Sequence, residues 1–185
     1  MQSVYKHLRR ALVLACLLAT SALAAPPPGA DAGQQAFDWE VGRWKTELKR
    51  LKEPLSGKQE WIEYSGTSVV SAVLDGRANL VELRVAGPGG RIEGASLRLY
   101  NPQAKQWSLN FASARDGTLT RPVHGGFREG RGQFYGEEEL DGRIVLVRFI
   151  ISRVGENSAK FEQAYSNDGG RSWETNWIAV DTRAD

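Results

Sequence analysis

Turn-forming residues recur about every ten positions through most of this 185-residue chain. Asp-Gly, Gly-Gly, Pro and Asn clusters of this kind mark tight reversals of the backbone. They stand at residues 54–57, 75–76, 87–90, 101–102, 116–117, 125–126, 130–132, 141–142, 155–157 and 168–170. Such short intervals favour strands joined as antiparallel hairpins and leave no room for long helices.

The segments between these turns alternate apolar and polar residues with a period of two, which is the pattern of β-strands. Clear examples are residues 96–99, 107–111 and 160–165. After residue 42 no window has the periodicity of an amphipathic helix. We expect a short N-terminal helical turn followed by about ten strands, beginning near Trp44, Trp61, Leu80, Ala95, Trp107, Val123, Gln133, Ile144, Ala159 and Trp173.

Strands that follow one another as hairpins must hide their edges, either in a sandwich or by closing into a barrel. Closure is the simpler outcome for an up-and-down meander. About eight strands already enclose packed side chains or one small ligand, and ten leave more room. The predicted fold is therefore all-β, a single antiparallel up-and-down barrel that contains a cavity.

The N-terminus has the three parts of an export signal in the required order. A basic stretch with Lys6, Arg9 and Arg10 precedes apolar residues 11–18, and Ala22-Leu23-Ala24 provides a small-x-small cleavage site. We therefore predict a signal peptide at residues 1–25, a Pro- and Gly-rich linker at 26–35 and the barrel domain at 36–185. The expected location is the periplasm or the extracellular medium.

Cleavage of the signal peptide would change the charge balance and the cysteine content, and both bear on function. Three basic residues and the sole cysteine, Cys16, would leave with the signal, so that 21 basic side chains face 22 acidic ones. A nearly neutral chain lacks the basic surface of a nucleic-acid-binding protein. Without cysteine there is no disulfide, thiolate nucleophile or cysteine metal site. No later apolar run approaches the roughly 20 residues of a membrane span.

A Gly-x-Trp element, Gly42-Arg43-Trp44, stands at the entrance to the first expected strand. The glycine permits a tight entry, and the tryptophan can close one barrel end with a large apolar surface. This element resembles the first strand of calycins, the lipocalins and their relatives. The resemblance implies a cation–π contact between Trp44 and an arginine of the last strand. Strict alternation from Trp173 places Trp177 and Arg183 on one face, which makes Arg183 that arginine.

Further landmarks extend the resemblance to residues 37–183. They look like those of a family of exported bacterial lipocalin-like domains for which no activity is established. The resemblance therefore implies a β-barrel and supplies no catalytic residues. The landmarks are Phe37-Asp38 to Trp44, Leu97 to Ser108, Gly126 to Gly136, and Tyr165 to Trp177.

Residues 166–173 fit the Asp-box pattern Ser-x-Asp-x-Gly-x-x-Trp, which is best known from sialidases. We interpret this single copy as a folding element: a hairpin in which Asp168 caps backbone N–H groups and Trp173 packs beneath. The alternative is a glycosidase. A six-bladed propeller would need roughly 240 residues, more than this chain has.

His124 would be the sole histidine of the cleaved chain. It is most simply a hydrogen-bonding loop residue. The alternative is an axial haem ligand, since haem-binding barrels of the nitrobindin type hold iron through one histidine. No other cofactor and no metal site is expected.

Alternation alone selects five candidates for the barrel interior and hence for ligand binding: Trp107, Phe111, Arg148, Gln163 and Trp177. Arg148 interrupts an otherwise apolar strand and should need a partner. One hypothesis makes it the anchor of a ligand carboxylate. The other makes it half of an internal structural pair with Glu162, Gln163 or Glu174.

These observations favour a small-molecule-binding barrel that takes one apolar or amphipathic ligand. Two alternatives remain open. One is a hydrolase or haem protein that uses His124 or internal carboxylates, and the other is a ligand-free envelope scaffold filled by its own aromatic side chains. With one histidine and no nucleophile elbow, we expect binding rather than catalysis.

Overall fold

Backbone turns occur at nearly all of the positions that the sequence predicts. The structure, a computed structural model, describes residues 32–184. Within this range the elements are η1 (Asp38–Glu40), β1 (Gly42–Leu51), β2 (Trp61–Val73), β3 (Ala78–Gly87), β4 (Gly90–Asn101), β5 (Gln106–Ser113), β6 (Thr118–Leu119), β7 (Val123–Arg128), β8 (Arg131–Leu140), β9 (Arg143–Gly155), β10 (Ser158–Ser166) and β11 (Glu174–Arg183). The predicted export signal and most of the predicted linker lie outside the described residues.

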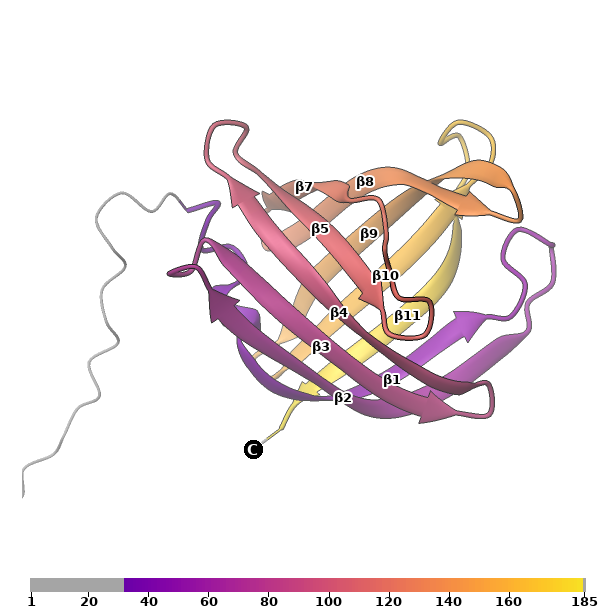
Figure 1. Ribbon diagram of the computed structural model, residues 1–185, viewed down its shortest axis with the longest axis horizontal. Coiled ribbons are helices and arrows are strands. Elements are labelled where there is room, and N and C mark those ends of the chain that lie inside the picture. The colour runs from indigo at the N-terminus through magenta and orange to yellow at the C-terminus, as the bar shows by residue number, and fades with distance from the viewer. Residues whose placement is uncertain (1–31, 185) are drawn as a thin grey trace, which may run out of the picture.

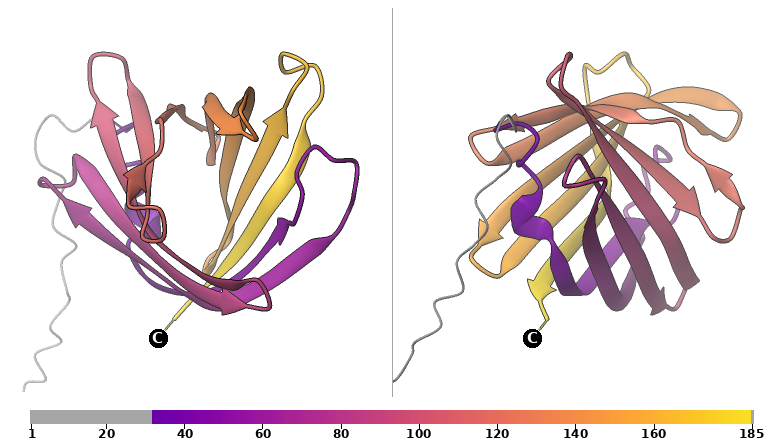
Figure 2. Two further views of the ribbon diagram at one scale, coloured as in Figure 1. Left: turned by 45° about the vertical axis from the view of Figure 1, so that its right-hand side comes forward. Right: turned by 60° about the vertical axis from the view of Figure 1, so that its left-hand side comes forward.

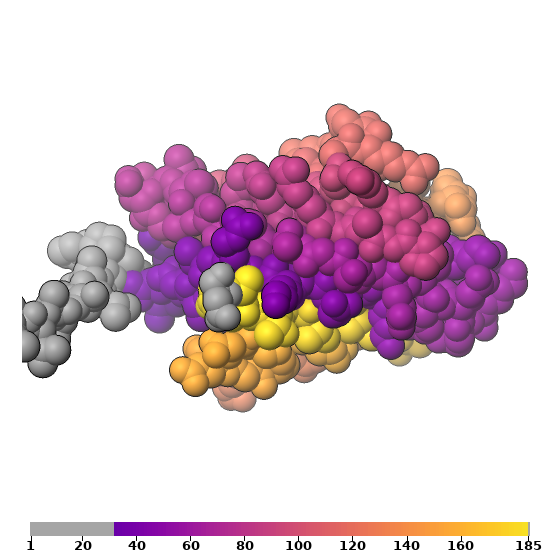
Figure 3. Space-filling view, turned by 90° about the horizontal axis from the view of Figure 1, so that it is seen from below, coloured from indigo at the N-terminus to yellow at the C-terminus, as the bar shows by residue number. Residues whose placement is uncertain are grey.

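Ten of these strands form a closed antiparallel ring (Figures 1 and 2). Each long strand pairs with the next, β5 pairs with β7, and β1 pairs with β11 to complete the circle. Seen from below, the first and last strands of the ring lie side by side, with indigo β1 next to yellow β11 (Figure 3). The prediction of an all-β antiparallel barrel of about ten strands with a short N-terminal helical turn is confirmed.

Two details differ from the prediction. The two-residue strand β6 adds to the end of β5 and was not expected. Gly125 and Gly126 were expected to form a turn but lie inside β7. A side chain at Gly125 would collide with the backbone of Gln133 on β8, so glycine there allows the two strands to approach closely.

The up-and-down order gives the barrel two different ends. At one end η1 crosses the opening, together with the turns β2–β3, β4–β5, β7–β8 and β9–β10; we call it the closed end. At the other lie the turns β1–β2, β3–β4, β8–β9 and β10–β11 and the connection from β5 to β7; we call it the open end (right in Figure 1). Among residues 32–184 the single helical element has three residues, and no described helix has the length and apolar character of a membrane span.

Candidate ligand-binding cavity

A cavity of about 580 Å³ extends inside the barrel from Glu40 and Trp44, next to the closed end, to the open end. Its lining comes from all the long strands of the ring and from the connections of the open end, including Lys52, Gly89 and Arg115. Cavities of this volume fall within the range of small-molecule sites, which is about 300–1,000 Å³.

An aromatic plug fills the closed end. Phe37, 1% exposed, packs edge-on against Trp107 at 4.9 Å and Phe127 at 4.8 Å and stacks on Phe134 at 5.9 Å, measured between ring centroids. The indole N–H of Trp107 donates to the carbonyl of Gly33 at 2.8 Å, which ties the N-terminal segment to the barrel. Trp107 therefore faces inward as predicted but belongs to the plug, outside the cavity lining.

The predicted contact between the last strand and the Gly-x-Trp element is present. The Arg183 guanidinium lies 3.9 Å from the Trp44 ring centroid and donates hydrogen bonds to the carbonyls of Val41 and Trp39 at 2.6 and 2.7 Å. Gly42 has φ +132°, and a side chain on it would collide with that guanidinium. Glycine is thus required for the arginine to reach the tryptophan.

A buried ion pair completes the closed end. Arg98 on β4 pairs with Glu40 of η1, and their exposed fractions are 6% and 8%. The Arg98 guanidinium also lies 4.3 Å from the centroid of Phe37. The pair joins residues far apart in sequence, so no local pattern predicts it.

The floor of the cavity, next to this ion pair, is polar. The Thr46 hydroxyl donates to Asp181 at 2.5 Å and lies 2.8 Å from the Ser68 hydroxyl. Burial raises the pKa of the Asp181 carboxyl to about 6, and the nearby charge of Glu40 adds to the rise. All three residues line the cavity.

Above this floor the cavity wall is apolar. The Phe149 and Phe161 rings meet at 5.1 Å, and Leu48, Leu83 and Trp177 pack around the same space. An apolar band of this kind favours a hydrophobic ligand body.

Toward the open end the wall becomes polar again. The Tyr165 hydroxyl donates to the Glu138 carboxylate at 2.9 Å, and burial raises the pKa of both groups. The side-chain amide of Gln163 donates to Asn176 at 3.0 Å. Arg50 lines the same region.

A β-bulge shapes this region, and the predicted alternation of inward and outward residues on β11 is therefore wrong. The register shifts between Gln163 and Ala164, so that Trp177 and Thr175 lie opposite consecutive residues of β10. Strict alternation therefore fails, and both Asn176 and Trp177 line the cavity. Trp173, predicted on the same face as Trp177, is not part of the cavity lining.

Three of the five predicted interior residues line the cavity: Phe111, Gln163 and Trp177. The prediction that Arg148 lies inside is wrong. Its strand neighbours Val147 and Phe149 line the cavity, so Arg148 faces outward, where its guanidinium lies 4.7 Å from the Trp173 ring centroid. Its partner is thus an aromatic ring and none of the three polar residues proposed.

The β10–β11 loop holds Trp173 over the outer wall. Asp168 accepts hydrogen bonds from the backbone N–H and hydroxyl of Ser172 at 3.0 and 2.7 Å, and these bonds lower the pKa of Asp168. Trp173 donates to the carbonyl of Gly170 at 3.1 Å and meets Tyr135 edge-on at 6.0 Å. The loop packs on the outside of the barrel, away from the cavity.

His124 is exposed on β7 and is not part of the cavity lining, whereas its neighbour Val123 is. A haem inside the barrel held by His124 therefore does not fit this geometry. In the part of the chain that the structure describes, no cluster of three or more histidine, cysteine or acidic residues is placed to hold a metal ion.

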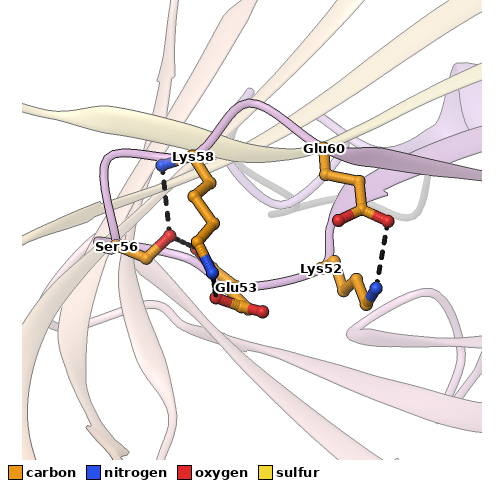
Figure 4. A network of polar contacts seen from close by, with 5 residues as sticks. All are labelled: Lys52, Glu53, Ser56, Lys58 and Glu60. Carbon is orange, nitrogen blue, oxygen red and sulfur yellow. Dashed lines mark hydrogen bonds and ion pairs between the residues drawn. The ribbon is translucent and has the colours of Figure 1, made fainter.

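The β1–β2 loop borders the mouth of the cavity through Lys52 and Pro54. Figure 4 shows the polar contacts within this loop. Lys58 pairs with Glu53 at 2.8 Å and Lys52 with Glu60 at 3.0 Å. The loop is anchored where the Leu55 backbone N–H donates to Glu174 of β11 at 2.5 Å.

Apart from Gln163, sequence reasoning missed the polar cavity residues, including Arg50, Thr46 and Asn176. A signal existed for β1: counting in twos from the inward Trp44 gives Thr46, Leu48 and Arg50. Asn176 enters the wall through the bulge, which alternation alone does not predict.

No protein-family model and no curated protein matches the sequence. Among solved structures, the chain is similar to the S-type phycobiliprotein lyase CPES from Guillardia theta, with a TM-score of 0.57 and 11% identity over 82% of this chain and 92% of that chain. It is also similar to a de novo designed fluorescence-activating β-barrel, with a TM-score of 0.43 and 10% identity over 81% of this chain and 98% of that one. The first likeness establishes a shared barrel fold, and the second is too low to carry an argument.

Proposed function

We propose that this protein is an exported binding protein that holds one small apolar or amphipathic molecule inside its barrel. The observation that carries the proposal is the cavity of about 580 Å³, apolar in its middle and polar at both ends. A side-chain-filled scaffold would leave no such space. The closed end confines the ligand to one entrance, because the Phe37 plug blocks the other.

The proposal extends to export and to family. The landmarks from Phe37 to Trp177 support a place among exported bacterial lipocalin-like domains, and the N-terminal signal pattern supports release into the periplasm or the medium. Expression in a bacterium followed by fractionation tests export. We expect a protein outside the cytoplasm whose first residue is Ala25 or Pro26; an uncleaved cytoplasmic chain would contradict this part.

Binding is tested with N-phenyl-1-naphthylamine, a neutral probe that fluoresces in apolar surroundings. We expect saturable binding of one probe per chain. Ser96→Phe adds a ring to the cavity wall and should weaken binding about tenfold or more, because the ring takes up space that the probe needs. Ala95→Phe adds the same ring beside the outward Glu82 and should bind like wild type.

Circular dichroism would verify that both variants fold. Absence of probe binding by the wild type, or equal binding by wild type and Ser96→Phe, would overturn the proposed function. A molecule that copurifies with the protein and is detected by native mass spectrometry would identify the natural ligand.

A further inference from the structure

Among the arginines that line the cavity, Arg50 and Arg98 differ in their partners. Arg98 has the Glu40 carboxylate. Arg50, on β1, makes no ion pair or hydrogen bond through its guanidinium within residues 32–184, and its Nε is shielded from solvent without an acceptor. Its nearest recorded partner is the Tyr64 ring, whose centroid lies 6.0 Å away. Arg50 therefore brings to the cavity a positive charge that has no ion-pair partner among the described residues.

A second donor without an acceptor lies beside it. Asn176 is 2% exposed and lines the cavity. Its Oδ1 accepts from Gln163, but its Nδ2 has no acceptor. Arg50 lies directly opposite Trp177, the residue next to Asn176, so the two unsatisfied groups occupy neighbouring positions on β1 and β11.

Two acidic groups of this region have other partners. Glu138 accepts from Tyr165, and Glu174 accepts from the backbone of Leu55. Neither forms an ion pair with Arg50 among the described residues. A partly buried cation and a buried amide N–H without acceptors carry a free-energy penalty that an incoming acceptor would remove. A carboxylate provides two acceptor oxygens and the complementary charge.

We propose that Arg50 and Asn176 form a carboxylate-binding site, so that the ligand is an amphipathic carboxylic acid. This inference rests on the proposed function and names its ligand class. The carboxylate lies in the half of the cavity near the mouth, and the apolar body extends past Leu48 and Phe161 toward the floor. Arg50 and Thr46 are four positions apart on β1, or roughly 13 Å of extended strand, which leaves room for such a body.

The test compares cis-parinaric acid, a fluorescent long-chain carboxylic acid, with its uncharged methyl ester at neutral pH. Wild type should bind the acid at least about tenfold more tightly than the ester, because a charged hydrogen bond contributes more than a neutral one. Arg50→Met should weaken binding of the acid about 10- to 100-fold and leave the ester unchanged. Arg43→Met, which removes an exposed arginine of the same strand, should behave like wild type.

The outcomes separate the two proposals. If wild type binds neither of these molecules nor N-phenyl-1-naphthylamine, the proposed function fails. If it binds N-phenyl-1-naphthylamine alone, the carboxylate site is overturned and the cavity stands. If wild type binds acid and ester equally, the cavity stands and the carboxylate site is overturned, whether or not Arg50→Met folds. Equal loss of acid and ester in a folded Arg50→Met would also overturn the site, because it would show a general effect on packing.

Discussion

The two ends of the barrel use similar residues to different effect. At the closed end Arg98 has a carboxylate, Trp44 has a guanidinium over its ring, and the aromatic plug is almost fully buried. Toward the open end, beside an open space, Arg50 has no ion-pair partner among the described residues and the side-chain N–H of Asn176 has no acceptor. The Nε of Arg98 also lacks an acceptor, but its charge is paired with Glu40. Polar groups inside a protein are normally satisfied. The contrast indicates that the closed end is built for stability and that the open half is completed by a ligand.

Breaking the closed end should have the largest effect on stability. Glu40→Gln leaves the charge of Arg98 buried without a counter-ion, and such losses are about 3–5 kcal/mol. Urea denaturation would measure the change in unfolding free energy. The double variant with Glu40→Leu and Arg98→Met removes both charges and should recover much of the loss. A cost below about 1 kcal/mol for Glu40→Gln would contradict a structural role for the pair.

Asp181, on the floor between the two ends, should make stability depend on pH. Its pKa is raised from 3.8 to about 6 by burial, so the folded state binds a proton more tightly than the unfolded state. This contribution to stability is therefore present below pH 3.8 and is lost as pH rises toward 6. The difference between the two pKa values corresponds to about 3 kcal/mol of unfolding free energy.

Asp181→Asn keeps an acceptor for Thr46 and removes the titration. We expect the variant to be more stable than wild type at pH 7 by up to about 3 kcal/mol and nearly equal at pH 4. Thermal denaturation of both proteins across this range would measure the difference. A constant difference between the two curves would contradict a raised pKa of Asp181.

Arg148 offers a smaller test on the outer wall. Arg148→Met removes the cation from the Trp173 ring and should cost about 1 kcal/mol of unfolding free energy. Binding of N-phenyl-1-naphthylamine should not change, because Arg148 lies outside the cavity lining. A variant that keeps its stability and loses probe binding would instead place Arg148 in the site.

The β1–β2 loop at the mouth should give the smallest effect. Lys58→Met breaks the exposed pair with Glu53, and exposed pairs contribute little because water screens them. We expect no measurable change in the denaturation midpoint and faster hydrogen exchange in residues 53–59. A clear fall in the midpoint would show that the loop supports the barrel.

The barrel was predictable because turn residues and alternation are local signals. The strand starts near Trp61, Trp107 and Val123, for example, coincide with the observed ones to within a residue. The Trp44–Arg183 contact was predictable because the Gly-x-Trp element resembles that of calycins, and this resemblance implies an arginine of the last strand against the tryptophan. Strand β6 was missed because two residues are too few for a periodic pattern.

The site was less predictable because several side chains of its strands do not follow the usual rule that apolar residues point inward and polar residues outward. On β4, Ser96 and Arg98 line the cavity while Leu99 is 37% exposed. On β11 a bulge breaks the strict alternation from which Trp173 was predicted to share a face with Trp177. Arg148 was misplaced because a continuous apolar strand has no polar face to mark the outside. Pairing across the sheet, which a single sequence does not specify, decides these cases.

The most direct test is a crystal structure of the protein grown with saturating N-phenyl-1-naphthylamine. We predict electron density for one probe inside the barrel between Leu48, Phe161 and Trp177, with the Phe37 plug unchanged. A probe bound only to the outer wall, or a barrel whose own side chains fill the space, would contradict the claim that the open half is a ligand site.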